Sequence, residues 1–247
     1  MSFESPARSS GAQIGFIAAL DVECASLRRH APHAGAWLVV QSGPGAARAA
    51  AAAARAVDGG ASLLVSWGFA GGLDATLAPG AVVVPKRVVQ VGASPLAVDT
   101  SWHAKLATLA DAFVLEQRDL LTVPAALESA DAKRAAAAAT NAVAVDMESA
   151  AIAAVAAQAR VPFVALRVVV DAAADALPRG AEQWIDAQGN RRLAPTLRAA
   201  VSMRQWRPLL NLAQRYRTAT GVLDRLAQAL AVRQLLAVDV ATRKAGS

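Results

Sequence analysis

The stretch from Ala144 to Asp175, AVDMESAAIAAVAAQARVPFVALRVVVDAAAD, limits most strongly what this chain can fold into. Its first half is rich in alanine and predicts a helix that starts near Val145. Its second half, from Val161 to Val170, is β-branched and apolar on both faces. Such a run is typical of a strand in a sheet that helices cover on both sides. The stretch therefore predicts an α/β fold.

Three ionisable side chains interrupt this apolar stretch. Glu148 shares a helical face with Ile152 and Val155, so its carboxylate begins an apolar stripe rather than a polar one. Arg167 lies inside the buried strand, where a guanidinium needs a carboxylate or a bound anion. Asp171 ends the strand, at the edge of the sheet where open α/β folds hold ligands. The three groups either converge on one pocket or include an internal ion pair that only supports the fold, and spacing alone leaves both readings open.

The composition sets limits on the class of protein. The 247 residues are 55% hydrophobic, but no unbroken apolar run reaches the roughly 18 residues of a membrane-spanning helix. The polar residues 1–13 lack the apolar segment of a signal peptide and predict a disordered lead-in and a cytoplasmic protein. Cys24 is the single cysteine, which excludes an internal disulfide; we interpret it as a core residue rather than a nucleophile.

Positive charge is concentrated in the C-terminal part of the chain. Residues 1–177 hold 13 Lys and Arg against 15 Asp and Glu, whereas residues 178–247 hold 12 against 4. The segment 178–247 has a helical pattern, interrupted near Pro195 and Pro208, in which arginine recurs beside large apolar residues: Trp184, Trp206, Leu209, Leu210 and Tyr216. Such helices either lie peripherally on the inner face of a membrane or pack on the body or on a second subunit. Nucleic acid is a poorer partner, because no recognition motif is present.

Three strands are expected before residue 72. The run from Ile14 to Leu20 leads into Glu23, which either caps a helix or faces a ligand or a water. The run from Trp37 to Gln41 leads into the turn at residues 42–45, which opens an alanine-rich helix and offers backbone N–H groups to an anion. The run from Ala61 to Trp67 enters a glycine loop at residues 68–72, and this loop returns into a strand. That return predicts a mixed sheet.

The segment between residues 86 and 143 predicts ordinary α/β elements. Strands are expected at Arg87–Val91 and Leu120–Val123, and helices at His103–Asp111 and over residues 129–140. We interpret His103 as a surface residue at a helix start rather than as a catalytic base.

The chain contains four segments in this order: GFIAALDVE, QSGPG, WGFAGGLDATLAPGAVVV, and VDMESAAIA followed by VPFVALRVVVDAAAD. Together they resemble the nucleoside phosphorylase and nucleosidase superfamily, in particular the purine nucleoside phosphorylase and methylthioadenosine nucleosidase group. The resemblance covers about residues 14–177 and implies a three-layer α/β domain, with a central mixed sheet flanked by helices and a basic helical extension at residues 178–247. The segments DAAADALP and RGAEQWIDAQGN resemble the hopanoid-associated branch, and this resemblance implies release of adenine from adenosylhopane.

The resemblance also implies roles for individual residues. Asp171 resembles the acid that protonates purine N7, and Arg167 resembles a positioning cation next to that acid. Glu23 matches the carboxylate that orients the attacking water. Glu148 resembles the ligand of the two ribose hydroxyls, with Met147 under the sugar. The remaining contacts to the ribose and the nucleophile would come from Gly68, Phe69, Ala70 and Gly71.

Two departures from the family pattern bear on the nucleophile. Phe69 stands where members commonly have a serine, and Ser66 where one branch has a phosphate-binding arginine. If phosphate is a co-substrate, its charge would be met by another arginine, and the candidates are Arg28, Arg29, Arg48 and Arg87. No aromatic residue occurs between Phe113 and Phe163 to stack on the base.

The first hypothesis is therefore an enzyme that cleaves the N-glycosidic bond of a 5′-substituted adenosine by phosphorolysis or hydrolysis. The resemblance implies no metal or organic cofactor, only inorganic phosphate as a possible co-substrate, and a homo-oligomer. A non-catalytic nucleoside-binding or membrane-interaction protein on the same fold is the second hypothesis. A phosphorylase of other base specificity is the third.

Overall fold

The computed structural model describes residues 13–32, 37–176, 186, 188–190 and 206–236, with side chains from residue 213 onward in the last range. The strands are β1 (Gln13–Ala18), β2 (Trp37–Gln41), β3 (Ala61–Gly72), β4 (Val82–Val83), β5 (Arg87–Val89), β6 (Leu96–Ala97), β7 (Leu115–Glu116), β8 (Leu120–Thr122), β9 (Ala144–Asp146) and β10 (Phe163–Asp171). The helices are α1 (Asp21–His30), α2 (Ala46–Asp58), α3 (Thr100–Ala107), the 3-10 helix η1 (Thr108–Asp111), α4 (Ala130–Thr140), α5 (Ser149–Ala159) and α7 (Trp206–Val232).

The strands form one mixed sheet around β3. Its path runs β6-β5-β8-β9-β3-β10-β4-β7, and β1 joins β3 to β2. The pairs β1–β2, β1–β3 and β3–β10 are parallel, whereas β3–β9 and β10–β4 are antiparallel. The predicted mixed sheet is therefore confirmed. The parallel arrangement brings the carboxyl ends of β1, β3 and β10 to one edge.

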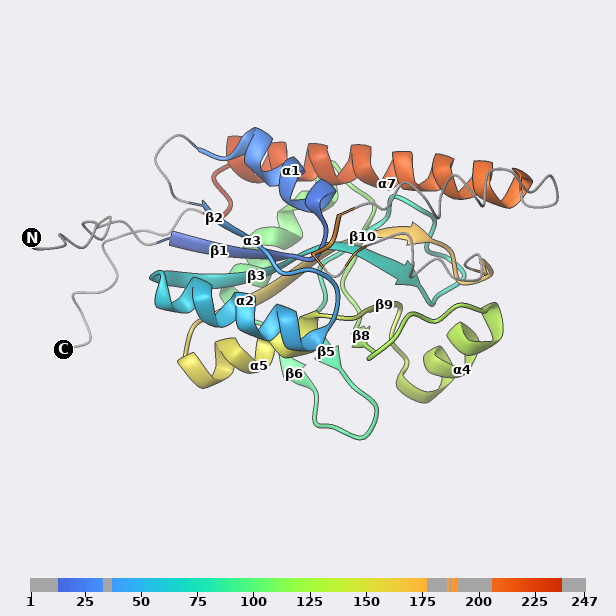
Figure 1. Ribbon diagram of the computed structural model, residues 1–247, viewed down its shortest axis with the longest axis horizontal. Helices are drawn as coiled ribbons and strands as arrows, with labels where there is room; N and C mark the ends of the chain where they lie inside the picture. Colours follow the sequence, from blue (N-terminus) through green and yellow to red (C-terminus); the bar gives the residue numbers. More distant parts are fainter. Residues whose placement is uncertain (1–12, 33–36, 177–185, 187, 191–205, 237–247) are drawn as a thin grey trace, which may run out of the picture.

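Helices cover both faces of this sheet, as Figure 1 shows. α1 and α7 lie side by side on one face, and α2 and α5 lie together on the other. The buried strands β1, β3 and β10 supply much of the core between these layers. The three-layer fold expected from the sequence is confirmed.

The glycine segment at residues 68–72 is a strand and not the predicted loop. β3 continues through it to Gly72, because β10 pairs with it on one side and β9 pairs with its last residues on the other. Gly68 has φ of +146°, a conformation that side chains with a Cβ rarely adopt. These glycines therefore let the sheet extend to the candidate site without side chains in the way.

Three local predictions are wrong. The helix predicted near Val145 begins at Ser149, because residues 144–146 form β9 and pair with β3 and β8. His103 is buried and not on the surface, since its Nε2 lies 3.0 Å from Val84 O. Pro208 does not interrupt a helix, because it falls in the first turn of α7, where a missing N–H costs nothing.

The described part of the C-terminal segment packs on the body. Along α7, apolar side chains from Ala219 to Leu230 join the main core, and the helix lies against α1 and β10. Tyr216 packs on Phe69 of β3, and Cys24 of α1 is fully buried, as its interpretation as a core residue requires. None of the helices in the described ranges has the length and hydropathy needed to cross a membrane. Trp184 and Pro195 lie outside the described residues, as do the side chains of Trp206, Leu209 and Leu210.

Candidate active site

Glu23 is buried in the first turn of α1, just past the end of β1. Its Oε2 accepts hydrogen bonds from the backbone N–H groups of Ala19 (2.9 Å) and Leu20 (2.8 Å). Its Oε1 accepts one from Phe69 N (2.8 Å), which ties α1 to β3. Burial raises the pKa of this carboxyl to about 7, against the opposing effects of the Arg167 charge and of these hydrogen bonds. Glu23 is therefore both a helix-capping residue and a carboxylate poised near neutral pH.

Gly68 marks the closest approach of β3 to these charges. A Cβ at this position would lie 2.3 Å from Glu23 Oε1 and 2.8 Å from Arg167 Nη1. Any side chain here would displace one of the two groups. Glycine at position 68 therefore allows the carboxylate and the guanidinium to gather beside the strand.

Arg167 is held in a buried polar network on β10. Its Nη2 lies 2.7 Å from Asp146 Oδ2 and donates to Ser66 Oγ at 2.6 Å and to Ser149 Oγ at 3.2 Å. Thr122 donates to the other oxygen of Asp146 at 2.7 Å. The internal ion pair that the sequence left open therefore exists, with Asp146 as the partner. Asp146 falls in the stretch where the sequence predicted the start of a helix, so nothing local pointed to it as the partner of Arg167.

Glu148 connects this network to the start of α2. Its Oε2 lies 3.9 Å from Arg167 Nη2, and its Oε1 accepts a hydrogen bond from Gly45 N at 2.8 Å. The turn that opens α2 was expected to offer backbone N–H groups to an anion, and it donates one to the Glu148 carboxylate of the protein itself. Burial raises the pKa of Glu148, while the Arg167 charge opposes that rise. Met147 is half-buried next to it in the chain.

Asp171 lies at the end of β10 with a partner that the sequence did not reveal. Lys133 of α4 forms an ion pair with Asp171 Oδ2 and donates to Ala172 O at 2.9 Å. The carboxyl faces the glycine segment, since a Cβ on Gly71 would lie 3.4 Å from Oδ1 and 3.5 Å from Oδ2. Burial raises the pKa of Asp171, and the Lys133 charge opposes this. The expected neighbour Arg167 forms no ion pair with Asp171 in the described part of the chain.

An apolar cluster borders Asp171 on the β9 side. Val145 Cγ1 lies 3.2 Å from the position that a Cβ on Gly71 would take. Val145 belongs to a buried cluster with Leu73 and Leu121, against which Val123 and Leu127 pack. Apolar surface is therefore available beside Asp171, although the sequence between Phe113 and Phe163 offers no aromatic residue to stack on a base.

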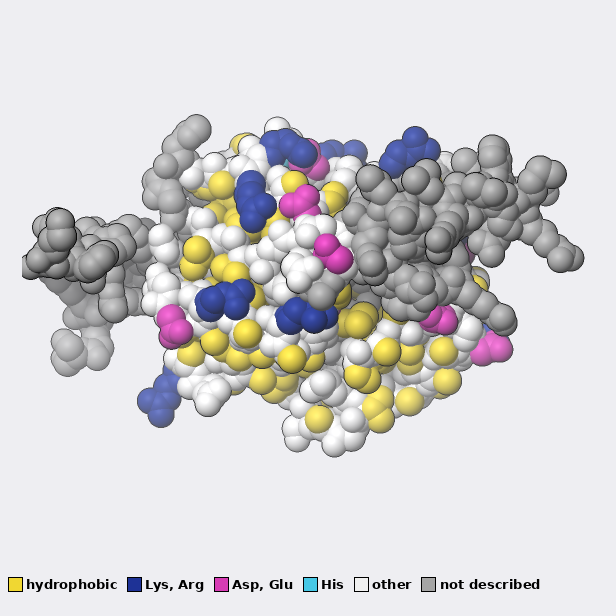
Figure 2. All heavy atoms as spheres, viewed as in Figure 1, with side chains coloured by type: hydrophobic (Ala, Val, Ile, Leu, Met, Phe, Trp, Pro, Cys, Tyr) yellow, Lys and Arg dark blue, Asp and Glu magenta, His cyan; other side chains and the backbone are white. Residues whose placement is uncertain are grey.

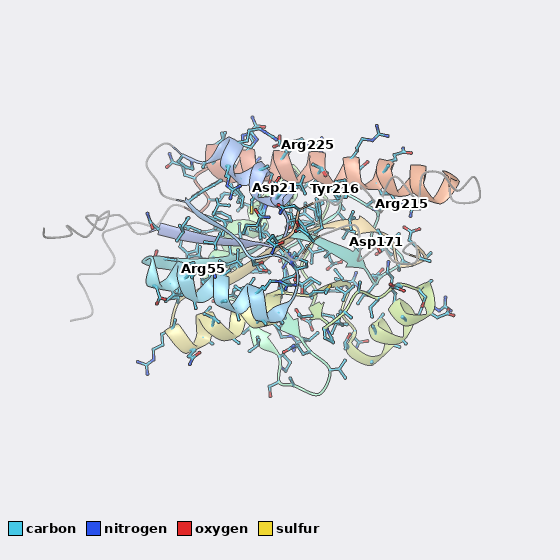
Figure 3. The ribbon with its side chains drawn as sticks, viewed as in Figure 1. Asp21, Arg55, Asp171, Arg215, Tyr216 and Arg225 are labelled. Carbon is cyan, nitrogen blue, oxygen red and sulfur yellow. The ribbon has the colours of Figure 1, made fainter. Side chains whose placement is uncertain are left out.

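Phe69 connects the glycine segment to α7. Its ring lies 5.4 Å from that of Tyr216, centroid to centroid, at an angle of 53°. Figure 3 shows Arg215 and Tyr216 on α7, the helix that passes over the end of the sheet where Asp171 lies. Ala70, the next residue of β3, is buried. The aromatic side chain that replaces the family serine is thus part of the contact between β3 and α7.

A short piece of the C-terminal segment also reaches this edge of the sheet. Gly189 O accepts a hydrogen bond from Asp21 N at 3.2 Å, and Gln188 O accepts one from Gln41 Nε2 at 2.8 Å. A Cβ on Gly189 would lie 2.0 Å from Ala19 O. The backbone around residue 189 therefore lies directly against the segment that carries Glu23.

The residues considered as phosphate ligands are engaged elsewhere. Ser66 is fully buried and bonded to Arg167 and Ser149. Each alternative arginine lies within ion-pair or hydrogen-bond distance of another protein group: Arg28 of Asp21, Arg29 of Asp224, Arg48 of Pro44 O, and Arg87 of Asp119. On the face drawn in Figure 2, Lys and Arg side chains lie in separate spots rather than in one patch. Within the described residues, no cluster of three or more His, Cys, Asp or Glu could hold a metal ion.

The site thus combines three buried carboxyl groups with raised pKa values around one glycine-rich strand. The sequence matches the family described as the Phosphorylase superfamily over residues 21–202. The chain belongs to this superfamily. No curated protein sequence matches it.

Solved structures share the fold of this phosphorylase-superfamily protein. The methylthioadenosine/S-adenosylhomocysteine nucleosidase of Neisseria meningitidis, in complex with methylthio-immucillin-A, matches with a TM-score of 0.68 at 18% identity. That match covers 89% of this chain and 99% of the other. The futalosine hydrolase of Helicobacter pylori matches with a TM-score of 0.70 at 16% identity, covering 91% and 98%. The Streptococcus pyogenes S-adenosylhomocysteine nucleosidase, in complex with 5-methylthiotubericidin, matches with a TM-score of 0.64 at 20% identity, covering 90% and 98%.

Membership in the superfamily confirms the resemblance at the level of the family. It also confirms the expectation of an enzyme of the phosphorylase and nucleosidase type. The hopanoid-associated branch and the roles of individual residues are finer statements, which are taken up below as proposals.

Proposed function

We propose that this protein hydrolyses the N-glycosidic bond of a 5′-substituted adenine nucleoside. The observation that carries the proposal is the arrangement of Glu23, Glu148 and Asp171 around residues 68–71 of β3. Burial raises the pKa of all three carboxyl groups, so each can change its protonation state nearer neutral pH than an exposed carboxyl can. Cleavage of a glycosidic bond needs one such group to protonate the leaving base and another to accept a proton from the nucleophile.

Each carboxyl group has a separate task in this reaction. Asp171 donates a proton to the base, so the base accepts the electron pair of the broken C1′–N9 bond and leaves as a neutral molecule. Glu23 orients a water molecule and takes its proton as the oxygen bonds to C1′. Glu148 accepts hydrogen bonds from the two ribose hydroxyls, because a carboxylate can accept two in one plane. Arg167 is paired with Asp146 and positions Glu23 and Glu148 by its charge.

Water is favoured over phosphate as the nucleophile by the charges around the site. Among the described residues, Arg167 is the cation that lies beside Glu23 and Glu148. Its guanidinium already forms an ion pair with Asp146 and donates a hydrogen bond to Ser66. A phosphate would also meet the Glu23 carboxylate, whereas a water molecule is oriented by it. The alternative, phosphorolysis, is an outcome of the test below.

The substrate class rests on the superfamily and on the matched structures, which include enzymes named for methylthioadenosine, S-adenosylhomocysteine and futalosine. The segments DAAADALP and RGAEQWIDAQGN favour adenosylhopane, a membrane lipid, as the 5′-substituted nucleoside. For such a substrate, peripheral membrane contact through the C-terminal segment is part of the proposal. The exposed Arg217 and Arg225 of α7 would face anionic headgroups. Assembly as a homo-oligomer also stays a prediction.

The test is release of free adenine by the purified protein from 5′-methylthioadenosine and from adenosylhopane in detergent, with and without phosphate. We expect release from at least one of them, with Asp171→Asn and Glu148→Gln lowering kcat/KM by about 10²-fold or more. The control variants Asp58→Asn and Glu128→Gln change the same residue types on the surface and should match the wild type. Release only with phosphate would make the protein a phosphorylase. Binding of nucleosides without release would favour the non-catalytic hypothesis.

A further inference from the structure

Lys133 is a buried cation on a helix that otherwise supplies little to the core. α4 is rich in alanine, and of its residues only Lys133 is fully buried, while the adjacent Arg134 is exposed and pairs with Asp131. Burying an ammonium group is costly unless partners replace its water. The structure supplies both partners from one place, the end of β10.

The two contacts of Lys133 give the two oxygens of Asp171 different surroundings. The Nζ atom pairs with Oδ2 of Asp171 and donates to Ala172 O at 2.9 Å. The carboxyl group lies beside Gly71 of β3, since a Cβ there would be 3.4 Å from Oδ1, 3.5 Å from Oδ2 and 3.2 Å from Val145 Cγ1. Among the described residues no hydrogen bond involves Oδ1. The lysine thus holds the carboxyl by Oδ2 beside the glycine segment and leaves Oδ1 available to a substrate.

From this geometry we propose that Lys133 is the positioning residue of the acid Asp171, a proposal that rests on the proposed function. In glycosidic cleavage the C1′–N9 bond breaks and its electron pair goes to the base, which takes the proton of Asp171 at a ring nitrogen. Water bonds to C1′ and gives its proton to Glu23. Asp171 is left as an anion, and the Lys133 ammonium stabilises that anion as it forms.

The other two charged groups near Asp171, Asp175 and Arg215, form an ion pair with each other. Asp175, which follows β10, accepts a hydrogen bond from Ala172 N at 2.8 Å and pairs with Arg215 of α7. These two residues and Lys133 are the charged groups that act on Asp171, and burial is the larger influence on its pKa. Lys133 is the cation in direct contact, so its removal should raise the pKa of Asp171 further and weaken it as an acid.

The test compares Lys133→Met with the wild type on two substrates that differ in the leaving group. An adenine nucleoside needs protonation of the base, whereas 4-nitrophenyl riboside releases an anion that needs none. We expect kcat for the adenine nucleoside to fall at least tenfold, with the alkaline limb of its pH profile moving to higher pH, and kcat for 4-nitrophenyl riboside to stay within about threefold. The control Arg134→Met removes the adjacent exposed cation and should change neither.

An equal loss on both substrates with an unchanged pH profile would overturn the proposal, because it indicates a purely structural role. If Lys133→Met does not fold, Lys133→Arg keeps the charge and is tested with the same pair of substrates. Lys133→Arg supports the proposal if the alkaline limb of its pH profile matches that of the wild type and its loss of kcat is confined to the adenine nucleoside. An equal loss of kcat on both substrates contradicts the proposal. Failure of the proposed function is distinguishable, since it shows as an inactive wild type or as an Asp171→Asn variant with full activity.

Discussion

The backbone N–H of Phe69 donates a hydrogen bond to Glu23 Oε1 over 2.8 Å, and so joins two residues that are 46 positions apart. This bond fixes the carboxylate of α1 against the glycine-rich end of β3. Burial at this point raises the pKa of Glu23 to about 7. Two predictions follow from that raised pKa, one for activity and one for stability.

Activity should fall below about pH 7. Glu23 must be ionised to accept a proton from the attacking water, and its protonation therefore removes the active form. We expect kcat/KM for 5′-methylthioadenosine to drop by about tenfold per pH unit below the pKa. In Glu23→Gln, kcat/KM should be low and should no longer fall as the pH is lowered below 7. If the variant keeps this acidic decrease, a group other than Glu23 causes it.

Stability should be greatest in mildly acidic solution. The pKa of Glu23 is about 7 in the folded chain against 4.5 for an exposed glutamate, so the folded state binds the proton more tightly than the unfolded state does. The contribution is fully present below pH 4.5 and is lost as pH rises through 7, by about 3 kcal/mol. Urea unfolding of wild type and Glu23→Gln between pH 5 and 8 measures it. Parallel pH dependences of the two proteins would contradict the prediction.

Gly68→Ala should disturb the site more than backbone strain alone explains. The added Cβ would meet Glu23 Oε1 at 2.3 Å, at a residue with φ of +146°. Gly60→Ala is the matched control, because Gly60 has φ of +94° and nothing lies within 4 Å of its Cβ position. We expect both variants to lose about 1–3 kcal/mol of stability, and Gly68→Ala alone to lose kcat by tenfold or more. Equal activities of the two variants would show that Glu23 is not held by this contact.

Asp146→Asn should destabilise the fold strongly. The substitution leaves the buried Arg167 guanidinium without its carboxylate at 2.7 Å. Breaking a buried pair from one side costs about 3–5 kcal/mol. Asp111→Asn removes an exposed partner of Arg233 and should cost at most about 1 kcal/mol. Denaturant midpoints of the two variants give the comparison, and similar midpoints would contradict a structural role for the Asp146 pair.

Gly189→Ala should affect the site from a distance in sequence. Its Cβ would lie 2.0 Å from Ala19 O, next to the backbone N–H groups that hold Glu23. Gly92→Ala, at φ of +77° with nothing within 4 Å, is the control for backbone strain. We expect a raised KM or a lowered kcat, by about threefold to tenfold, in Gly189→Ala only. Identical kinetics in both variants would show that the segment near residue 189 does not support the site.

The sequence predicted the elements whose patterns are long and local. β2 has the predicted bounds, and the buried strand that carries Arg167 lies within a few residues of its prediction. The glycine segment was predicted as a loop because glycine is a poor strand residue, whereas hydrogen bonds from β9 and β10 keep it extended. β9 has only three residues, too few for an alternating pattern to reveal it.

The site was predictable only in part, for a similar reason. Glu23, Glu148 and Asp171 stand at ends of predicted strands or helices, where a sequence pattern and a family resemblance both draw attention to them. Lys133 lies within an alanine-rich helix beside Arg134, and nothing local says which of the two cations is buried. Its contact with Asp171 spans 38 residues and exists only once α4 packs near β10.

The most direct test of the central claim is product analysis with 5′-methylthioadenosine in phosphate-free buffer. The account predicts that the wild-type protein forms free adenine and a reducing pentose in equal amounts over repeated turnovers, and that Asp171→Asn forms neither at a comparable rate. Release of adenine only after phosphate is added would contradict hydrolysis, and intact substrate after prolonged incubation with this compound and with adenosylhopane, with or without phosphate, would contradict glycosidic cleavage altogether.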